Sequence, residues 1–202
     1  FSTGYMANTG TLNALLDRKS LVVQDRLNHA SLLDGGLSSG ATFKRFNHGD
    51  YSHLDQQLSG DSPQKWAVTD GIFSMDGDQA DLRRMANVCA KHNAGLMVDD
   101  AHGTGVLGKG GRGTGEYFDC LDRIDLHMGT FGKALGCAGA YLAAEQVVIN
   151  TLINNSRAFI FSTSLPPGVP AAAMAAFDLV DSEEGRLLRN KLEANRKQYS
   201  QL

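Results

Sequence analysis

Residues 94–105 read "AGLMVDDAHGTG", an apolar run that ends abruptly in two aspartates. The run carries no polar residue on either face, which is typical of a strand that helices cover on both sides of a sheet. Asp99 stands where this strand leaves the core, so we expect its carboxylate to be partly desolvated. The stretch therefore predicts a buried parallel strand with a polar site at its carboxyl end.

Similar apolar runs recur on both sides of this stretch, and segments with helical spacing of apolar residues separate them. Strands are predicted over residues 20–25, 65–73, 94–100, 124–131 and 138–144. Helices are predicted over residues 5–18, 81–93, 144–157 and 166–180. This alternation predicts an α/β protein with a mostly parallel central sheet and helices on both faces, in three layers.

The composition is that of a globular protein, with 42% hydrophobic and 20% charged residues among 202. A formal net charge of -3 argues against a nucleic-acid partner, which usually requires a basic patch. Cys89, Cys120 and Cys137 are widely spaced. They favour a reducing compartment, the cytoplasm, over a disulfide framework or a zinc site. No apolar run approaches the ~18 residues of a membrane span, so we expect no membrane partner.

Both ends of the sequence predict that it is part of a longer protein. It begins at Phe1 rather than at a methionine, and it ends inside the helical pattern "RLLRNKLEANRKQYSQL". We expect residues 1–180 to form one large domain. The charged, helical segment 181–202 is expected to connect this domain to a smaller one.

Polar side chains gather after four of the predicted strands. Because ligands bind beyond the carboxyl ends of parallel strands, we expect these side chains to surround one site. They are His29; Ser74 and Asp76; Asp99, Asp100 and His102; and Thr130 and Lys133.

The aspartates and the histidine of "DDAH" leave two interpretations open. Asp99, Asp100 and His102 could bind a metal ion, but no further well-placed ligand is evident and hard-cation loops carry more carboxylates. Alternatively, Asp99 caps a turn and His102 bonds only to backbone. We expect no metal.

Lys133 is the one charged residue in "GTFGKALGCAGA", residues 129–140. A phosphate-binding loop would need a glycine where His127 stands and a serine or threonine where Ala134 stands, so that interpretation fails. A surface lysine is the ordinary alternative. The small apolar surroundings instead favour a dry pocket, in which a lysine has a lowered pKa and can attack a carbonyl group.

Pyridoxal 5'-phosphate is the common cofactor with such a carbonyl, and the other clusters meet its needs. Its ring nitrogen requires a carboxylate, which Asp99 could supply. His29 could lie flat on the ring, and His102 or Ser74 could donate to the phenolic oxygen. The phosphate could bind at the helix start in "STGYMAN", with hydroxyls from Thr130 and from "FSTS", residues 161–164.

Five motifs in order resemble the α-oxoamine synthases, a family of pyridoxal-phosphate enzymes of fold type I. They are "NHASLLDG" (28–35), "TDGIFSMDGD" (69–78), "VDDAHGTGVLGKGGRG" (98–113), "GTFGKALG" (129–136) and "FSTSLPP" (161–167). The resemblance runs over nearly the whole chain. It implies the large domain of fold type I.

The resemblance also implies a role for each site residue. Lys133 would bind the cofactor covalently and later move the substrate proton, and Asp99 would pair with the ring nitrogen. His102, aided by Ser74, would bond the phenolic oxygen, and His29 would stack on the ring. The phosphate would be held by backbone N–H groups of Gly4 and Tyr5, the hydroxyl of Thr130 and, from a neighbouring subunit, Thr163.

The reaction implied by the resemblance is a decarboxylative condensation of L-alanine with an acyl group carried by CoA or by acyl carrier protein. The active site would lie at the interface of a homodimer. A family member that uses glycine is the first alternative. A non-catalytic α/β binding domain, with structural polar residues at the strand ends, is the alternative from another class.

Two departures from the family pattern qualify these implications. Asp70 stands where many relatives carry a glutamate, which keeps the carboxylate but shortens the side chain. The small carboxy-terminal domain of the family, with the arginine that holds the amino-acid carboxylate, is absent from these residues. We therefore expect weak or no turnover from this chain alone.

Overall fold

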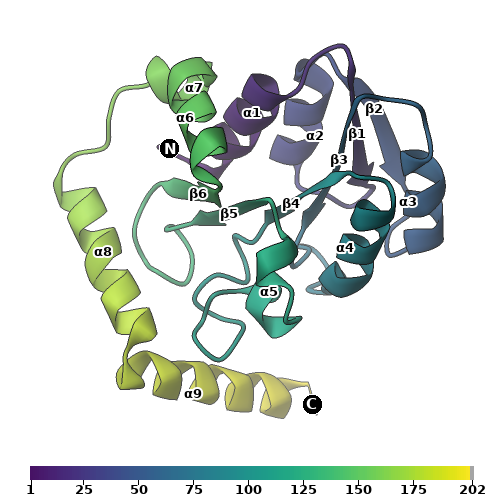
Figure 1. Cartoon of the computed structure of the whole chain (residues 1–202). Coiled ribbons are helices and arrows are strands. Elements are labelled where there is room, and N and C mark those ends of the chain that lie inside the picture. Colours follow the sequence, from purple (N-terminus) through teal and green to yellow (C-terminus); the bar gives the residue numbers. More distant parts are fainter. Residues whose placement is uncertain (201–202) are drawn as a thin grey trace.

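The computed structural model describes residues 1–200, which fold around one six-stranded sheet (Figure 1). In the order β2–β1–β3–β4–β5–β6, the first five strands are parallel and β6 is antiparallel to β5. The strands are β1 (Ser20–Asp25), β2 (Thr42–Phe46), β3 (Gln64–Asp70), β4 (Gly95–Asp99), β5 (Leu126–Thr130) and β6 (Ala140–Ala144). The predicted, mostly parallel α/β sheet is confirmed.

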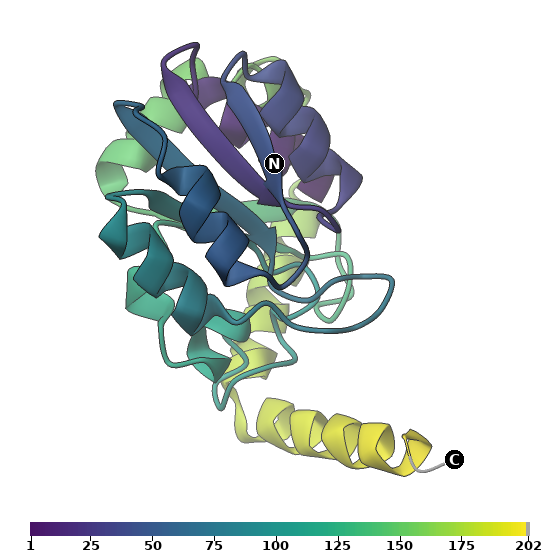
Figure 2. The ribbon, with the colours of Figure 1, turned by 90° about the vertical axis from the view of Figure 1, so that its right-hand side faces the viewer.

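Helices cover both faces of the sheet, as Figures 1 and 2 show from two sides. One face carries α1 (Gly4–Leu15), α2 (Ala30–Ser38), α6 (Gln146–Asn155) and α7 (Arg157–Ile160). The other carries α3 (Tyr51–Leu58), α4 (Leu82–Lys91), the short α5 (Thr114–Tyr117) and the 3₁₀ turn η1 (Leu121–Arg123). The three predicted layers are therefore present.

The strand β4 shows why its sequence is apolar without alternation. Leu96 and Val98 belong to the apolar cluster under α3 and α4, whereas Met97 belongs to the cluster under α1 and α2. All three side chains are fully buried. Successive side chains of a strand point to opposite faces, so a strand covered on both faces must be apolar at every position.

Three of the elements that sequence analysis did not predict, β2, α2 and α3, lie at one edge of the sheet. β2 is an edge strand whose sequence "TFKRF" is largely exposed, so it lacks the apolar run of a central strand. α2 contains Gly35 and Gly36, which weaken a helix but allow close packing. A Cβ at Gly35 would lie 2.9 Å from Cδ1 of Leu12 on α1. α3 follows β2 and was not predicted either.

The last two helices lie outside the three layers (Figures 1 and 2), and the first of them packs its Phe177 ring against Phe131 and Tyr141. They are α8 (Gly168–Asp181) and α9 (Glu183–Tyr199). The Arg189 guanidinium of α9 donates to the carbonyls of Val180 (2.8 Å) and Lys109 (2.9 Å). The division into a domain of residues 1–180 and a connecting segment 181–202 stays a prediction, and residues 201–202 of that segment lie outside the described residues.

No helix within residues 1–200 has the length and hydropathy of a membrane span.

Replacing Leu96 by alanine should lower the free energy of unfolding by about 2–5 kcal/mol, because it leaves a cavity in a close-packed core. Chemical denaturation followed by circular dichroism measures this change. The control is Leu37→Ala, since Leu37 is 63% exposed and its truncation should change the free energy by less than about 0.5 kcal/mol. Equal losses in both variants would contradict the assignment of Leu96 to the core.

Candidate functional site

A cavity of about 480 Å³ opens at the carboxyl ends of the central strands, beside the first turn of α1. Eight of the nine predicted site residues line it: Gly4, Tyr5, His29, Ser74, Asp99, His102, Thr130 and Lys133. Asp70 lines it as well. The strand-end clusters that the sequence separates by up to about a hundred residues thus surround one space, as the parallel topology predicts.

Two carboxylates meet at the edge of this cavity. Asp70 ends β3 and Asp99 ends β4, and the two residues are direct partners in the parallel register. Both are 5% exposed. Two buried like charges at such a place cannot both be ionised without a large cost, so the pair favours holding one proton.

The hydrogen bonds of Asp99 favour its ionised form. Its Oδ2 accepts from Nδ2 of Asn8 at 2.6 Å, and its Oδ1 accepts from the backbone N–H of Ala101 at 3.0 Å. Burial raises the pKa of Asp99, and the net shift is upward although these two donors and the charge of Lys133 act in the opposite direction. Asn8 is fully buried in α1 and was not predicted as a site residue. Its place one helical turn after Gly4 was the only signal in the sequence.

The carboxylate of Asp70 accepts fewer hydrogen bonds than that of Asp99. Its Oδ2 accepts from the backbone N–H of His29 at 2.6 Å, and its own N–H donates to Oδ1 of Asn28 at 3.1 Å. Burial and the charge of Asp99 raise the pKa of Asp70 to about 8. Asp70 accepts one such hydrogen bond against two for Asp99, so Asp70 is the member of the pair that favours the protonated form.

His29 begins α2 as its N-cap. Its Nδ1 accepts from the backbone N–H of Ser31 at 3.2 Å and lies 2.7 Å from the Ser31 Oγ. That hydroxyl oxygen also accepts from Nδ2 of Asn8 at 2.9 Å. These bonds fix the orientation of the imidazole beside the cavity. Nδ1 therefore carries no proton in this geometry, and the hydrogen lies on Nε2.

The second aspartate of "DDAH" points away from the cavity. The Asp100 carboxylate accepts from the backbone N–H of Thr114 (2.8 Å), from the Thr114 hydroxyl (2.9 Å) and from Nε2 of His127 (3.1 Å). These bonds hold the loop of residues 101–113. The loop passes so close that a Cβ at Gly113, where φ is +90°, would overlap the Asp100 carboxylate. Asp99 and Asp100 thus face different surroundings, and the arrangement does not favour the metal interpretation. Asp76 is exposed and does not line the cavity.

The start of α1 offers donors for an anion. Thr3 caps the helix by accepting from the N–H of Met6 at 3.1 Å, and no acceptor among residues 1–200 takes the N–H groups of Gly4 and Tyr5. Oγ1 of Thr130 is buried without a hydrogen-bond partner among the same residues. A Cβ at Gly4 would lie 2.7 Å from Cγ2 of Thr130, so only glycine lets the helix start approach this strand end. Free N–H groups at a helix start are an anion-binding arrangement.

Lys133 lines the cavity from the loop that follows β5. Its charge acts on Asp70, Asp99 and His102 across the cavity. The dry pocket expected for Lys133 is wrong, because this residue is exposed and so are its neighbours Gly132 and Ala134. Small apolar residues in a sequence bury a lysine only if other parts of the chain cover them, and in residues 1–200 none does.

His102 and Ser74 face the cavity from neighbouring loops. Burial and the charge of Lys133 lower the pKa of His102, so its ring is neutral at pH 7 and can donate one N–H to an oxygen atom. Thr163, the ninth predicted residue, is exposed and does not line the cavity. Its contact with the site of a neighbouring subunit stays a prediction.

Comparisons with known proteins match this chain over almost its full length. The family model described as aminotransferase class I and II matches residues 1–201. An 8-amino-7-oxononanoate synthase from Citrifermentans bemidjiense is 53% identical over 197 residues, which make up 96% of this chain and 51% of that protein. A second 8-amino-7-oxononanoate synthase, from Geotalea daltonii, is 54% identical over 198 residues, which make up 96% of this chain and 50% of that protein. The chain therefore spans about half the length of the curated relatives it matches.

Solved structures are similar in fold. Serine palmitoyltransferase from S. paucimobilis, with a bound pyridoxal phosphate–myriocin aldimine, gives a TM-score of 0.92 at 35% identity. It matches 96% of this chain and 49% of its own. The 8-amino-7-oxononanoate synthase from Francisella tularensis gives a TM-score of 0.84 at 31% identity. The match covers 96% of this chain and 56% of that structure's chain.

The carboxylate pair predicts how stability depends on pH in the cofactor-free protein. The pKa of Asp70 rises from 3.8 when unfolded to about 8 when folded, so the folded state binds the extra proton between these values. The contribution of the Asp70 carboxyl to stability is full below pH 3.8 and falls as the pH rises toward about 8, by at most about 1.4 kcal/mol per pH unit for one proton. Asp70→Asn should remove the part of the pH slope that Asp70 contributes, measured by urea denaturation at several pH values.

The control for this measurement is Asp61→Asn, because Asp61 is an exposed aspartate outside the cavity. It should keep the pH slope of the unmodified protein. An unchanged slope in Asp70→Asn would show that Asp70 does not bind the extra proton of the folded state.

Proposed function

This chain belongs to the aminotransferase class I and II family, and from that premise we propose that its cavity binds pyridoxal 5'-phosphate and forms most of an acyltransferase active site. The observation that carries the proposal is the buried carboxylate of Asp99, which shares one cavity with the amine of Lys133. The five sequence motifs indicated the same family relationship. Two solved serine palmitoyltransferase relatives hold the cofactor, one of them as its internal aldimine.

The residues present fit the cofactor. Asp99 is a buried acid that a cationic ring nitrogen would stabilise, and the unpartnered hydroxyl of Thr130 lies beside the free helix start of α1. We assign Lys133 to covalent attachment and Asp99 to the ring nitrogen. His29 would contact the ring face, His102 and Ser74 the phenolic oxygen, and Gly4, Tyr5 and Thr130 the phosphate. When bound, the cofactor supplies an electron sink for a carbanion next to the substrate nitrogen.

The side chains of this chain would then act in defined ways. Asp99, held by Asn8 and Ala101, keeps a negative charge where positive charge must be stabilised. The protonated Asp70 beside it adds no second charge. The Nζ atom of Lys133, once free, takes the proton from the α-carbon of the amino acid. His102, neutral at pH 7, donates its N–H to an oxygen without adding charge.

For the whole protein we infer a decarboxylative condensation in biotin biosynthesis. L-Alanine and the pimeloyl thioester of CoA or of a carrier protein would give 8-amino-7-oxononanoate, carbon dioxide and the free thiol. The support is the identity of 53% and 54% to synthases of that name, against 35% to serine palmitoyltransferase. Glycine C-acetyltransferase, which joins glycine to acetyl-CoA, is the alternative within the family.

We further infer a homodimer in which Thr163 reaches the phosphate site of the partner. The exposed apolar side chains of Phe161 and Met174, 72% and 70% exposed, are consistent with a surface that another part of the assembly covers. The proposed cytoplasmic location rests on the free cysteines, which favour a reducing compartment.

Replacing Lys133 by alanine should abolish the visible absorbance band of the lysine-bound cofactor when pyridoxal phosphate is added, because no amine remains at the cavity. The matched control is Lys109→Ala, since Lys109 is also a lysine in a glycine-rich loop but is exposed away from the cavity. The band should persist in that variant. If the unmodified folded protein gives no band, the non-catalytic binding domain becomes the better interpretation.

Substrate preference separates the family members. We expect the protein, expressed with any sequence that flanks these residues in its gene, to release CoA fastest with L-alanine and pimeloyl-CoA. The assay compares alanine with glycine and pimeloyl-CoA with acetyl-CoA in all four combinations. A preference for glycine with acetyl-CoA would replace the synthase assignment by the acetyltransferase one.

A further inference from the structure

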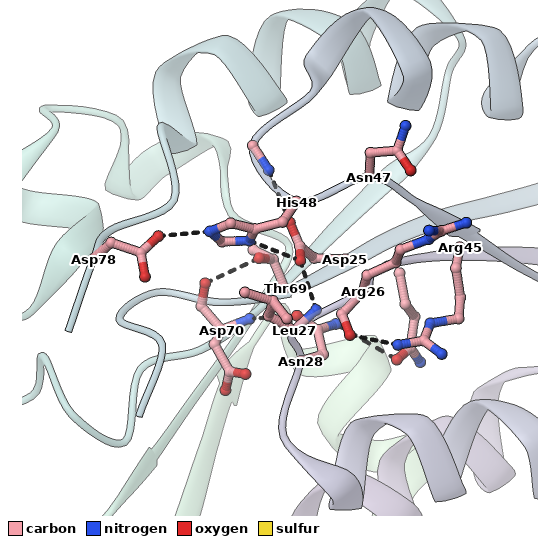
Figure 3. A network of polar contacts seen from close by, with 12 residues as sticks. Asp25, Arg26, Leu27, Asn28, Arg45, Asn47, His48, Thr69, Asp70 and Asp78 are labelled. Atoms are coloured by element: carbon pink, nitrogen blue, oxygen red, sulfur yellow. Dashed lines mark hydrogen bonds and ion pairs between the residues drawn. The ribbon is translucent and has the colours of Figure 1, made fainter. Parts of the chain in front are cut away.

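A histidine outside the cavity joins two of the segments that form it (Figure 3). His48 lies in the loop between β2 and α3, and each of its ring nitrogens faces a carboxylate. Nδ1 is 2.9 Å from Oδ1 of Asp25, the last residue of β1, and Nε2 is 2.7 Å from Oδ2 of Asp78. The reaction described above uses none of these three side chains.

This geometry requires a protonated ring. A neutral imidazole has one N–H and one lone pair, so it could donate to only one of the two carboxylates. Burial lowers the pKa of His48, but the hydrogen bonds to Asp25 and Asp78 and their charges act against it, and the net shift is upward. These two carboxylates are the charged groups that face the ring, since the Arg45 guanidinium instead donates to the carbonyl of Arg26 (Figure 3).

The outer carboxylate belongs to a small hairpin, residues 71–80. The N–H of Phe73 donates to the carbonyl of Asp78 at 2.9 Å, and the N–H of Ala80 donates to that of Gly71 at 3.1 Å. The ring of Phe73 also meets the His48 ring edge-on, with 4.5 Å between centroids. His48 therefore holds the hairpin at two points, one on either side of Ser74, the residue that lines the cavity.

The inner carboxylate anchors the turn that leads to His29. Asp25 is 2% exposed, its Oδ1 accepts from the N–H of Leu27 at 2.8 Å, and its backbone carbonyl accepts from Asn28 at 3.3 Å. Asn28 in turn accepts from the N–H of Asp70. One side of His48 is thus bonded to a rigid, buried network that contains cavity residues, and the other side is bonded to a hairpin on the surface.

We propose that His48 is a positioning residue: in its protonated form it bridges Asp25 and Asp78 and holds the hairpin where Ser74 lines the cavity. As the pH rises and the ring loses a proton, one nitrogen presents a lone pair to a carboxylate. The bond to Asp78 is the one released, because the Asp78 side chain is 43% exposed whereas that of Asp25 is 3% exposed and held by backbone N–H groups. The hairpin then loosens, and Ser74 is no longer held in place.

Hydrogen–deuterium exchange of the 71–80 segment tests the bridge without any cofactor. The protein is expressed with any flanking sequence of its gene, and protection factors are compared across pH. Asp78→Asn should lower protection about 10-fold at the acidic end, which is the effect of one ordinary hydrogen bond. Protection in the unmodified protein should fall toward the same level as the pH rises, whereas the variant should show no such pH dependence.

Matched variants separate this role from a general loss of stability. Asp76→Asn removes an exposed carboxylate of the same hairpin that does not contact His48, and should behave like the unmodified protein. Asp78→Glu should restore most of the protection because it keeps the charge. His48→Gln should reproduce the pH-independent, loosened state. Protection that is independent of pH in the unmodified protein, or unchanged in Asp78→Asn, would overturn the proposal.

Titration with pyridoxal phosphate tests the link to the cavity, and this step alone rests on the proposed function. Asp78→Asn should bind the cofactor several-fold more weakly than Asp76→Asn does, and the difference should shrink as the pH rises. A loosened hairpin with unchanged cofactor affinity would overturn the positioning role. Failure of every variant and of the unmodified protein to bind the cofactor would overturn the proposed function, while the exchange measurement still decides the role of His48.

Discussion

The burial of two acids side by side is the constraint on which the site depends. Parallel strands β3 and β4 bring Asp70 and Asp99 into register where both strands leave the core. A pair of buried carboxylates destabilises a fold unless protons, donors or cations compensate it. Asn8, Ala101 and the N–H of His29 supply the donors, so the helices α1 and α2 are tied to the strand ends by the same bonds that set the charge of the site.

The two carboxyl groups of this pair, those of Asp70 and Asp99, have different chemical consequences. A proton on Asp70 leaves one negative charge, on Asp99, facing a cavity that Lys133 also lines. A ligand with a positive ring nitrogen would complete this charge balance, and a ligand with a phosphate would satisfy the free N–H groups at the start of α1. Pyridoxal phosphate combines both groups in one molecule, which is why the geometry supports it better than a metal ion or a nucleotide.

The hydrogen bonds around the cavity extend beyond the residues that would touch a ligand. His48 and Asp25 connect the outer hairpin to the turn before His29, and Asn28 connects that turn to Asp70. Asp100 holds the loop after β4 from the opposite side of the same strand end. The loops that carry Ser74, His29 and His102 are therefore each anchored by a buried or half-buried acid, which gives a loop-built site the rigidity that catalysis needs.

The sequence by itself determined the layered α/β fold and predicted nine site residues, eight of which line the cavity. Continuous apolar runs such as residues 96–98 predict strands covered on both faces, and parallel strands place their polar ends together whatever their separation in the chain. Only the tertiary structure decided the roles of Asn8, Asp70 and His48, because a bond such as that from Asn8 to Asp99 joins residues 91 positions apart. It also corrected the environment of Lys133, since burial depends on what covers a loop and local composition does not contain that information.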